Sequence, residues 1–162
     1  MERQRPRIRK PEDQDLLQEC AYFDVRRASR ALSRFYDDFM RDTPIKGTQF
    51  SFLRMIMIEK ELTLTTLSRY MLMDRTSVTR ALDPLIRDKF VKIRKSEDDG
   101  RVRYVSLTKK GCDAVIHAEP YWRKAQEALL DVIGTTRWQS MRSVLRETTR
   151  KVRHIHDDVV HH

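Results

Sequence analysis

A short stretch of the chain combines small hydroxyl side chains with a guanidinium group at helical spacing. Asp74 is suited to cap a helix, and the residues after it divide into an apolar face and a polar face. The polar face carries groups that can meet base edges and phosphates, namely Thr76, Ser77, Thr79 and Arg80. An α-helix fits the major groove of DNA, and its N-terminal turn reaches the bases. The stretch therefore predicts a DNA-contacting helix that begins at Arg75.

A β-hairpin with further basic groups is predicted to follow. The apolar period changes to two over residues 90–94 and 103–107, and the polar loop between them contains Asp99-Gly100, a common turn signal. Arg101 and Arg103 lie on this hairpin, where guanidinium groups can enter a neighbouring minor groove. Helices followed by such a two-stranded wing form a winged helix-turn-helix.

Positive charge concentrates over the same region. The 162 residues include 33 Lys and Arg against 24 Asp and Glu, which gives a formal net charge of +9. Residues 69–110 hold twelve basic and six acidic residues, so two thirds of the surplus falls there. A solvated face alone does not predict such a concentration. The surplus indicates a polyanionic partner, either nucleic acid or an anionic membrane, and the hydroxyl and guanidinium pattern favours DNA over a membrane.

Other chemistry has little support in the sequence. No nucleophile motif and no glycine-rich phosphate loop occur, so we expect no enzyme activity, no catalytic residue and no cofactor. Histidines near the C-terminus could suggest a metal site, but such a site needs ligands fixed from several directions, and we expect none. These histidines are His154, His156, His161 and His162. No apolar run approaches the ~18 residues of a membrane span, and residues 1–15 lack a secretory signal, which predicts a cytoplasmic protein.

The remaining elements are predicted from apolar spacing and from residues that cap or stop helices. A first helix of about 26 residues should start at Asp15 and end at Thr43-Pro44. A fifth helix should run past Pro120 and stop at Gly134. We expect Pro120 to bend this helix and Pro84 to bend the fourth helix. The expected N-caps are Thr48, Thr63, Asp74, Thr108 and, in a capping box with Gln139, Thr136.

These elements give a mainly α fold with a small two-stranded wing, in which long dimerisation helices flank a winged helix-turn-helix. We expect a basic arm at 1–12, an N-terminal dimerisation helix at 13–45, the DNA-binding domain at 46–108 and C-terminal dimerisation helices at 109–158. The arm is either a solvated tail or an extra contact to phosphate or to the minor groove. The terminal helices carry more apolar surface than one chain can bury, which predicts a homodimer.

Several motifs together resemble the multiple antibiotic resistance regulator (MarR) family. They are MDRTSVTRALDPLIRDKFV from Met73 to Val91, DGR at Asp99–Arg101, LTKKG at Leu107–Gly111 and GTQ at Gly47–Gln49. The resemblance implies a two-fold dimer on a pseudo-palindromic operator. It also implies that Asp99 orients the wing arginine, Arg101. Two departures are Gly100, where relatives often carry a basic residue, and Lys89, where a glycine often ends the recognition helix.

The candidate DNA-binding residues extend from the third helix to the wing. They are Thr65, Thr66, Arg75, Thr76, Ser77, Thr79, Arg80, Asp99, Arg101 and Arg103. Members of the family commonly sense a small aromatic acid or phenol in the cleft between the dimerisation and DNA-binding parts. The resemblance places this cleft here among the first, second and fifth helices, where paired arginines could hold a carboxylate. Candidate lining residues here are Tyr22, Phe23, Arg26, Arg27, Phe52 and Met55. The two arginines could equally form ion pairs between subunits or face solvent.

Three other functions remain as alternatives. The protein could sense redox state through Cys20 on the first helix, although both Cys20 and Cys112 fit buried structural thiols better. It could be a winged-helix module that binds proteins, but the pattern of Arg80 and Arg101 speaks against that. An enzyme that uses a winged helix only to dimerise would need a second domain, for which 162 residues leave no room.

Overall fold

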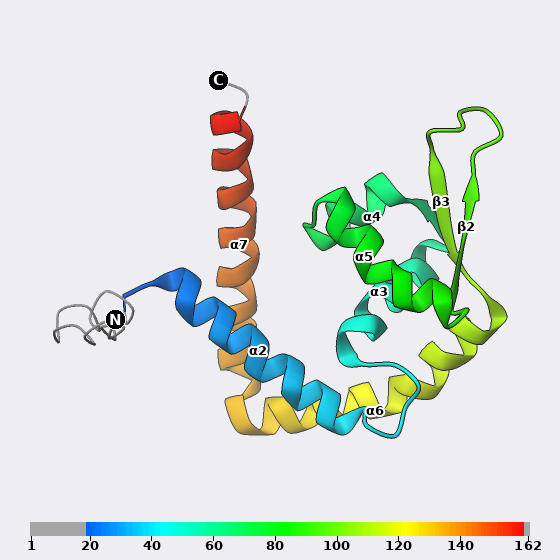
Figure 1. Cartoon of the computed structure of the whole chain (residues 1–162). Helices are drawn as coiled ribbons and strands as arrows, with labels where there is room; N and C mark the ends of the chain where they lie inside the picture. The colour runs from blue at the N-terminus through cyan, green and yellow to red at the C-terminus, as the bar shows by residue number, and fades with distance from the viewer. Residues whose placement is uncertain (1–18, 161–162) are drawn as a thin grey trace, which may run out of the picture.

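The computed structural model describes residues 19–160. The expected arm at 1–12 and the start of the expected first helix lie outside these residues. In chain order the elements are α2 (Ala21–Phe39), α3 (Gly47–Glu59), β1 (Glu61–Thr63), α4 (Leu64–Met71), α5 (Arg75–Arg87), β2 (Val91–Lys95), β3 (Arg103–Leu107), α6 (Lys109–Ile133) and α7 (Thr135–Val160). Figure 1 shows residues 47–107, here called the winged lobe, beside the long helices α2, α6 and α7.

The mainly α fold with a small wing is confirmed, but the sheet has three strands rather than two. Its order is β1-β3-β2 and both pairings are antiparallel. Strand β3 runs over 103–107 as predicted, whereas β2 begins one residue later than expected. The prediction missed β1 because its three residues contain one buried apolar side chain, Leu62, which is too little to show an alternation.

The hydrophobic core lies mainly within the winged lobe and against α6. The side chains with less than 2% exposure include Leu53, Ile56, Leu67, Val78, Leu82, Leu85, Val105 and Val115. Three of them fix α5, but Ile86, which we expected to point inward, is 38% exposed because it lies at the margin of the apolar stripe. No residue of α2 is buried, and no described side chain of α7 is buried. The two helices therefore contribute little to the core of a single chain.

Most helix caps agree with the sequence predictions. Thr63, Asp74 and Thr108 each accept a hydrogen bond from a backbone N–H in the first turn of α4, α5 and α6. Two predicted caps are wrong. Thr48 lies inside α3, whose N-cap is Lys46, with its N–H donating to the Gln49 side chain at 2.9 Å. Thr136 lies inside α7, because that helix starts immediately after the stop at Gly134.

The prolines within α5 and α6 do not end these helices, which continue to Arg87 and Ile133. The turn that follows α5 forms without a glycine. Lys89 adopts the left-handed conformation, with φ of 62°, and the N–H of Phe90 donates to the carbonyl of Leu85. This pattern is the helix stop that glycine usually provides. The departure at Lys89 therefore leaves the turn into β2 unchanged, at the cost of a conformation that a side chain disfavours.

The Asp74 cap at the start of α5 gives a prediction about acid stability. The side-chain and backbone hydrogen bonds from Ser77 lower the pKa of Asp74 below its ordinary value of 3.8. Stabilisation from the ionised carboxyl is therefore present above that value and is lost as pH falls through the lower pKa of the folded state. We expect the melting temperature of the wild type to fall relative to that of Asp74→Asn, which caps without titrating, between about pH 5 and about pH 2. A difference that stays constant would contradict this role.

Candidate nucleic-acid interface

The first turns of α5 present two side chains that no polar group of the described residues engages. Thr76 and Arg80 are exposed, and neither makes a side-chain hydrogen bond or ion pair within residues 19–160. Ser77 and Thr79 differ, because their hydroxyls donate to the Asp74 carboxylate at 2.5 Å and to the Arg75 carbonyl at 2.9 Å. Their donors are occupied, which leaves the hydroxyl oxygens as acceptors and the Thr79 methyl group for apolar contact.

The candidate threonines of α4 have different surroundings. Thr65 is exposed on the second residue of the helix, whereas Thr66 is half-buried. The hydroxyl oxygens of Thr66 and Thr63 lie 2.9 Å apart and are hydrogen-bonded at the cap of the helix. Thr65 is therefore open to a ligand, while Thr66 already serves the cap.

Arg101 lies at the tip of the hairpin, and 96% of its side chain is exposed. Asp99 is close to it, but its carboxylate mainly builds the turn. One carboxylate oxygen accepts the backbone N–H of Arg101 at 2.9 Å and lies 3.7 Å from Nε of the same residue. The geometry places Asp99 where it can influence the guanidinium, through a contact longer than a hydrogen bond.

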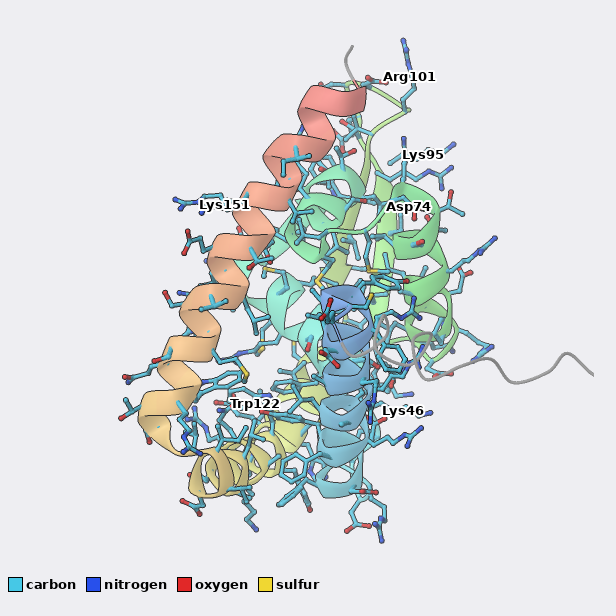
Figure 2. All side chains as sticks on the ribbon, turned by 90° about the vertical axis from the view of Figure 1, so that its left-hand side faces the viewer. Lys46, Asp74, Lys95, Arg101, Trp122 and Lys151 are labelled. Atoms are coloured by element: carbon cyan, nitrogen blue, oxygen red, sulfur yellow. The ribbon has the colours of Figure 1, made fainter. Side chains whose placement is uncertain are left out.

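Two cations oppose each other at the distal end of the sheet. Lys95 ends β2 and pairs in register with Arg103, which begins β3, and both residues are exposed. Like charges directly opposite each other on a sheet are destabilising. Neither has an acidic partner within 4.0 Å among the described residues. Figure 2 shows Lys95, Arg101 and Asp74 along one edge of the molecule. A polyanion at this edge would relieve the repulsion between the cations.

Most basic residues of the 69–110 segment are likewise without an acidic partner. Ion pairs engage Arg87, Arg94, Arg101 and Lys109. No ion pair in the described part of the chain engages Arg69, Arg75, Arg80, Lys89, Lys92, Lys95, Arg103 or Lys110. Lys95 was not among the predicted site residues, and only the strand register, which pairs it with Arg103, could have identified it.

A largely apolar pocket of about 510 Å³ lies between α2, α3, α6 and α7. Its walls include Leu32, Tyr36, Trp122, Met141 and Leu145, and its one charged residue is Asp24. The Tyr36 hydroxyl donates to Gln126 at 2.7 Å, and partial burial raises the pKa of Tyr36. The pocket can therefore take an apolar or aromatic molecule.

The six predicted ligand-lining residues do not line this pocket. Arg26 and Arg27 instead lie over the rings of Tyr22 and Phe23, each 5.3 Å from the ring centre, on the exposed part of α2. Phe52 is buried in the core of the winged lobe and Met55 packs against it. The pocket adjoins the three helices expected to form the ligand cleft, together with α7. Apolar spacing does not distinguish core positions from pocket walls.

The remaining candidate chemistry is sparse in residues 19–160. Cys20 lies just before α2 rather than on the helix, and both it and Cys112 are free thiols that are half-buried rather than buried. Within the described residues, no three His, Cys, Asp or Glu side chains come together as metal ligands. No helix in this part of the chain is long and apolar enough to span a membrane.

Comparisons with known proteins agree with this arrangement. The sequence profile of the MarR family matches residues 43–102. The M. tuberculosis transcriptional regulator MosR, solved in complex with DNA, is 32% identical, with 83% of this chain and 99% of that chain covered and a TM-score of 0.73. No match was found among curated proteins.

More distant structures share the fold. A cysteine-to-serine mutant of E. coli MarR complexed with operator DNA is 18% identical, covers 76% of this chain and 89% of its own, and has a TM-score of 0.70. The Streptomyces coelicolor regulator PcaV, in complex with its natural ligand, is 16% identical, with 83% and 94% coverage and a TM-score of 0.73. With MosR 32% identical over nearly its whole length, the chain described here belongs to the MarR family of transcription regulators.

Proposed function

We propose that the protein is a cytoplasmic homodimer that binds double-stranded DNA at a pseudo-palindromic operator and regulates transcription as a repressor. The opposed cations Lys95 and Arg103 carry this proposal, because no acidic side chain of residues 19–160 lies close enough to relieve their repulsion. The MosR and MarR structures with DNA support it for relatives of the same fold. A phosphate backbone between the wing and α5 would neutralise both cations.

Individual residues would have different roles in such a complex. Arg80 and Thr76 would read base edges in the major groove, since both extend from the N-terminal part of α5 with free polar groups. Arg75, Lys95 and Arg103 would contact phosphates and set the register of the protein on the duplex. Arg101 would enter the minor groove from the hairpin tip, with Asp99 as its neighbour.

A second copy of the chain would cover the apolar faces of α2 and α7. Along α7, apolar side chains recur at three- and four-residue steps, and several are more than half exposed, namely Val144, Val152 and Ile155. Val132 at the end of α6 and Val25 on α2 are also exposed, at 84% and 54%. An apolar stripe of this length on a soluble chain marks an interface. Its continuity over the helices outside the winged lobe favours a symmetric dimer.

The pocket between α2, α3, α6 and α7 would hold the small ligand that releases the operator. Trp122 stacks on Phe50, with ring centres 5.7 Å apart, and so links the pocket wall to the core of the winged lobe. A flat aromatic molecule between α2 and α3 would therefore lie against α3, which packs on β1 and β3 of the winged lobe. The PcaV complex with its natural ligand supports ligand binding in a protein of this fold. For Cys20, no described contact favours redox sensing over packing.

Replacing the arginine at the reading face tests DNA binding. We expect Arg80→Ala to weaken binding to a duplex selected by the wild type from a random pool by ~1–3 kcal/mol. Arg87→Ala is the matched control, because it removes the same charge from the far end of α5. Fluorescence anisotropy at fixed salt gives both affinities. An equal loss in the two variants would mean that Arg80 contributes charge alone.

A charge placed on the apolar stripe tests the dimer. The wild type should sediment at about twice 19.4 kDa at micromolar concentration. Val144→Glu should shift it toward the monomer, because the dimer would bury an unpaired carboxylate. Ser143→Glu adds the same charge to the neighbouring polar face and should leave the dimer intact. A monomeric wild type would refute the proposed assembly.

Filling the pocket tests ligand release. A panel of phenols and aromatic acids should contain a compound that lowers the operator affinity of the wild type and of Ser33→Ala. Ser33→Phe places a ring in the pocket and should make the affinity insensitive to that compound, because Ser33 is one of its lining residues. Release that is unchanged in Ser33→Phe would place the ligand elsewhere.

A further inference from the structure

One face of the small sheet is polar and carries a linked set of side chains from all three strands. The register places Glu61 opposite Ser106 and Thr63 opposite Tyr104, while Arg94 lies on the other side of Tyr104. Residues directly opposite each other in a sheet share a face. Glu61, Tyr104 and Arg94 therefore lie on the same surface, one on each of β1, β3 and β2.

Arg94 extends across the central strand to the far one. Its guanidinium carbon lies 4.4 Å from the centre of the Tyr104 ring. Beyond the ring it donates two hydrogen bonds to Glu61, from Nε at 2.9 Å and from Nη2 at 2.6 Å. Two parallel bonds of this kind fix direction as well as distance, and the aromatic face beneath holds the guanidinium plane. The bond to Arg94 also lowers the pKa of Glu61, so the pair remains ionised near neutral pH.

The contacts of Arg94 with Tyr104 and Glu61, here called the Arg94 bridge, lie where the sheet changes from three strands to two. Strand β1 ends at Thr63, whose partner is Tyr104, so the sheet has three strands up to Tyr104 and only two beyond it. The hairpin tip, with Lys95, Arg101 and Arg103, lies in the two-stranded part. A two-stranded ribbon by itself is only marginally stable in water, and it twists more strongly than a wider sheet. The Arg94 bridge lies at the junction where the ribbon leaves the lobe.

The other end of the bridge is attached to the helix-turn-helix. Glu61 begins β1, and Thr63 at its end caps α4, the helix that precedes α5. A force on the hairpin is therefore transmitted through Arg94 and Glu61 to the element that supports the recognition helix. Arg94 itself is already paired and stacked, which distinguishes it from the unpaired cations Lys95 and Arg103.

We propose that Glu61, Arg94 and Tyr104 are positioning residues for DNA binding, which fix the angle of the wing relative to α5 without contacting DNA. Arg101 and Arg103 would then reach the groove and the backbone from a pre-set direction. This inference rests on the proposed DNA-binding function. Simple electrostatics predicts the opposite sign for loss of Glu61, since removing a negative charge beside DNA should tighten binding.

The test compares Glu61→Gln with a control, Glu59→Gln, which removes the same charge at the end of α3. Among the described residues, the Glu59 carboxylate accepts a hydrogen bond only from the Tyr70 hydroxyl. We expect Glu61→Gln to weaken binding to the selected duplex about three- to tenfold, and Glu59→Gln to leave it equal or tighter. In an Arg101→Ala background, Glu61→Gln should lose part of its effect, because one of the groups that it positions is gone. The double variant Glu61→Arg with Arg94→Glu exchanges the two charges and should recover part of the DNA affinity that Glu61→Gln loses.

The outcomes distinguish failure of the positioning role from failure of the proposed DNA binding. Equal or tighter binding by Glu61→Gln would overturn the positioning role, and so would an undiminished loss in the Arg101→Ala background, which indicates general destabilisation. The melting temperature of each variant identifies such destabilisation directly. A wild type that selects no duplex would instead refute DNA binding, and this inference with it.

Discussion

Burial of one face of α5 is the constraint on which the rest of the molecule depends. Val78, Leu82 and Leu85 are fully buried, and they hold a helix of only 13 residues against the lobe while its opposite face stays open. Isolated helices of that length are marginal in water, so packing and the Asp74 cap must supply the stability. The free side chains Thr76 and Arg80 can serve recognition only because the buried face fixes their direction.

Acidic side chains pair with some cations of the molecule and leave others without a partner among the described residues. Glu61 neutralises Arg94 inside the wing, and Glu119 on α6 pairs with Arg54 of α3 at 3.3 Å, where the winged lobe meets the long helices. The cations at the distal edge, Lys95 and Arg103, have no such partner in the described chain. These two ion pairs join different elements of the chain, whereas Lys95 and Arg103 remain for a polyanion. Exposed ion pairs contribute little to stability in themselves, so their value here lies in geometry.

Local signals predicted most elements of the fold and fewer details of the site. Thr63, Asp74 and Thr108 were identified as caps because a cap depends on neighbouring residues. The bridge from Arg94 to Glu61 was not, because it joins residues 33 positions apart through a strand too short to predict. The pocket adjoins the expected helices but is not lined by the candidate ligand residues, since only packing decides that Phe52 enters the core and Trp122 the pocket. Local hydrogen bonds already engage the hydroxyls of Thr66, Ser77 and Thr79: the first two bond to the cap residues Thr63 and Asp74, and the third donates to the Arg75 carbonyl.

The central claim is that two winged lobes, related by a two-fold axis, read DNA through α5 and the wing. Selection of duplexes from a random pool by the full chain tests it most directly. The account predicts enrichment of one pseudo-palindromic sequence, with half-site centres about one helical turn, ~10 bp, apart. Enrichment of a single asymmetric site, or of no sequence at all, would contradict it.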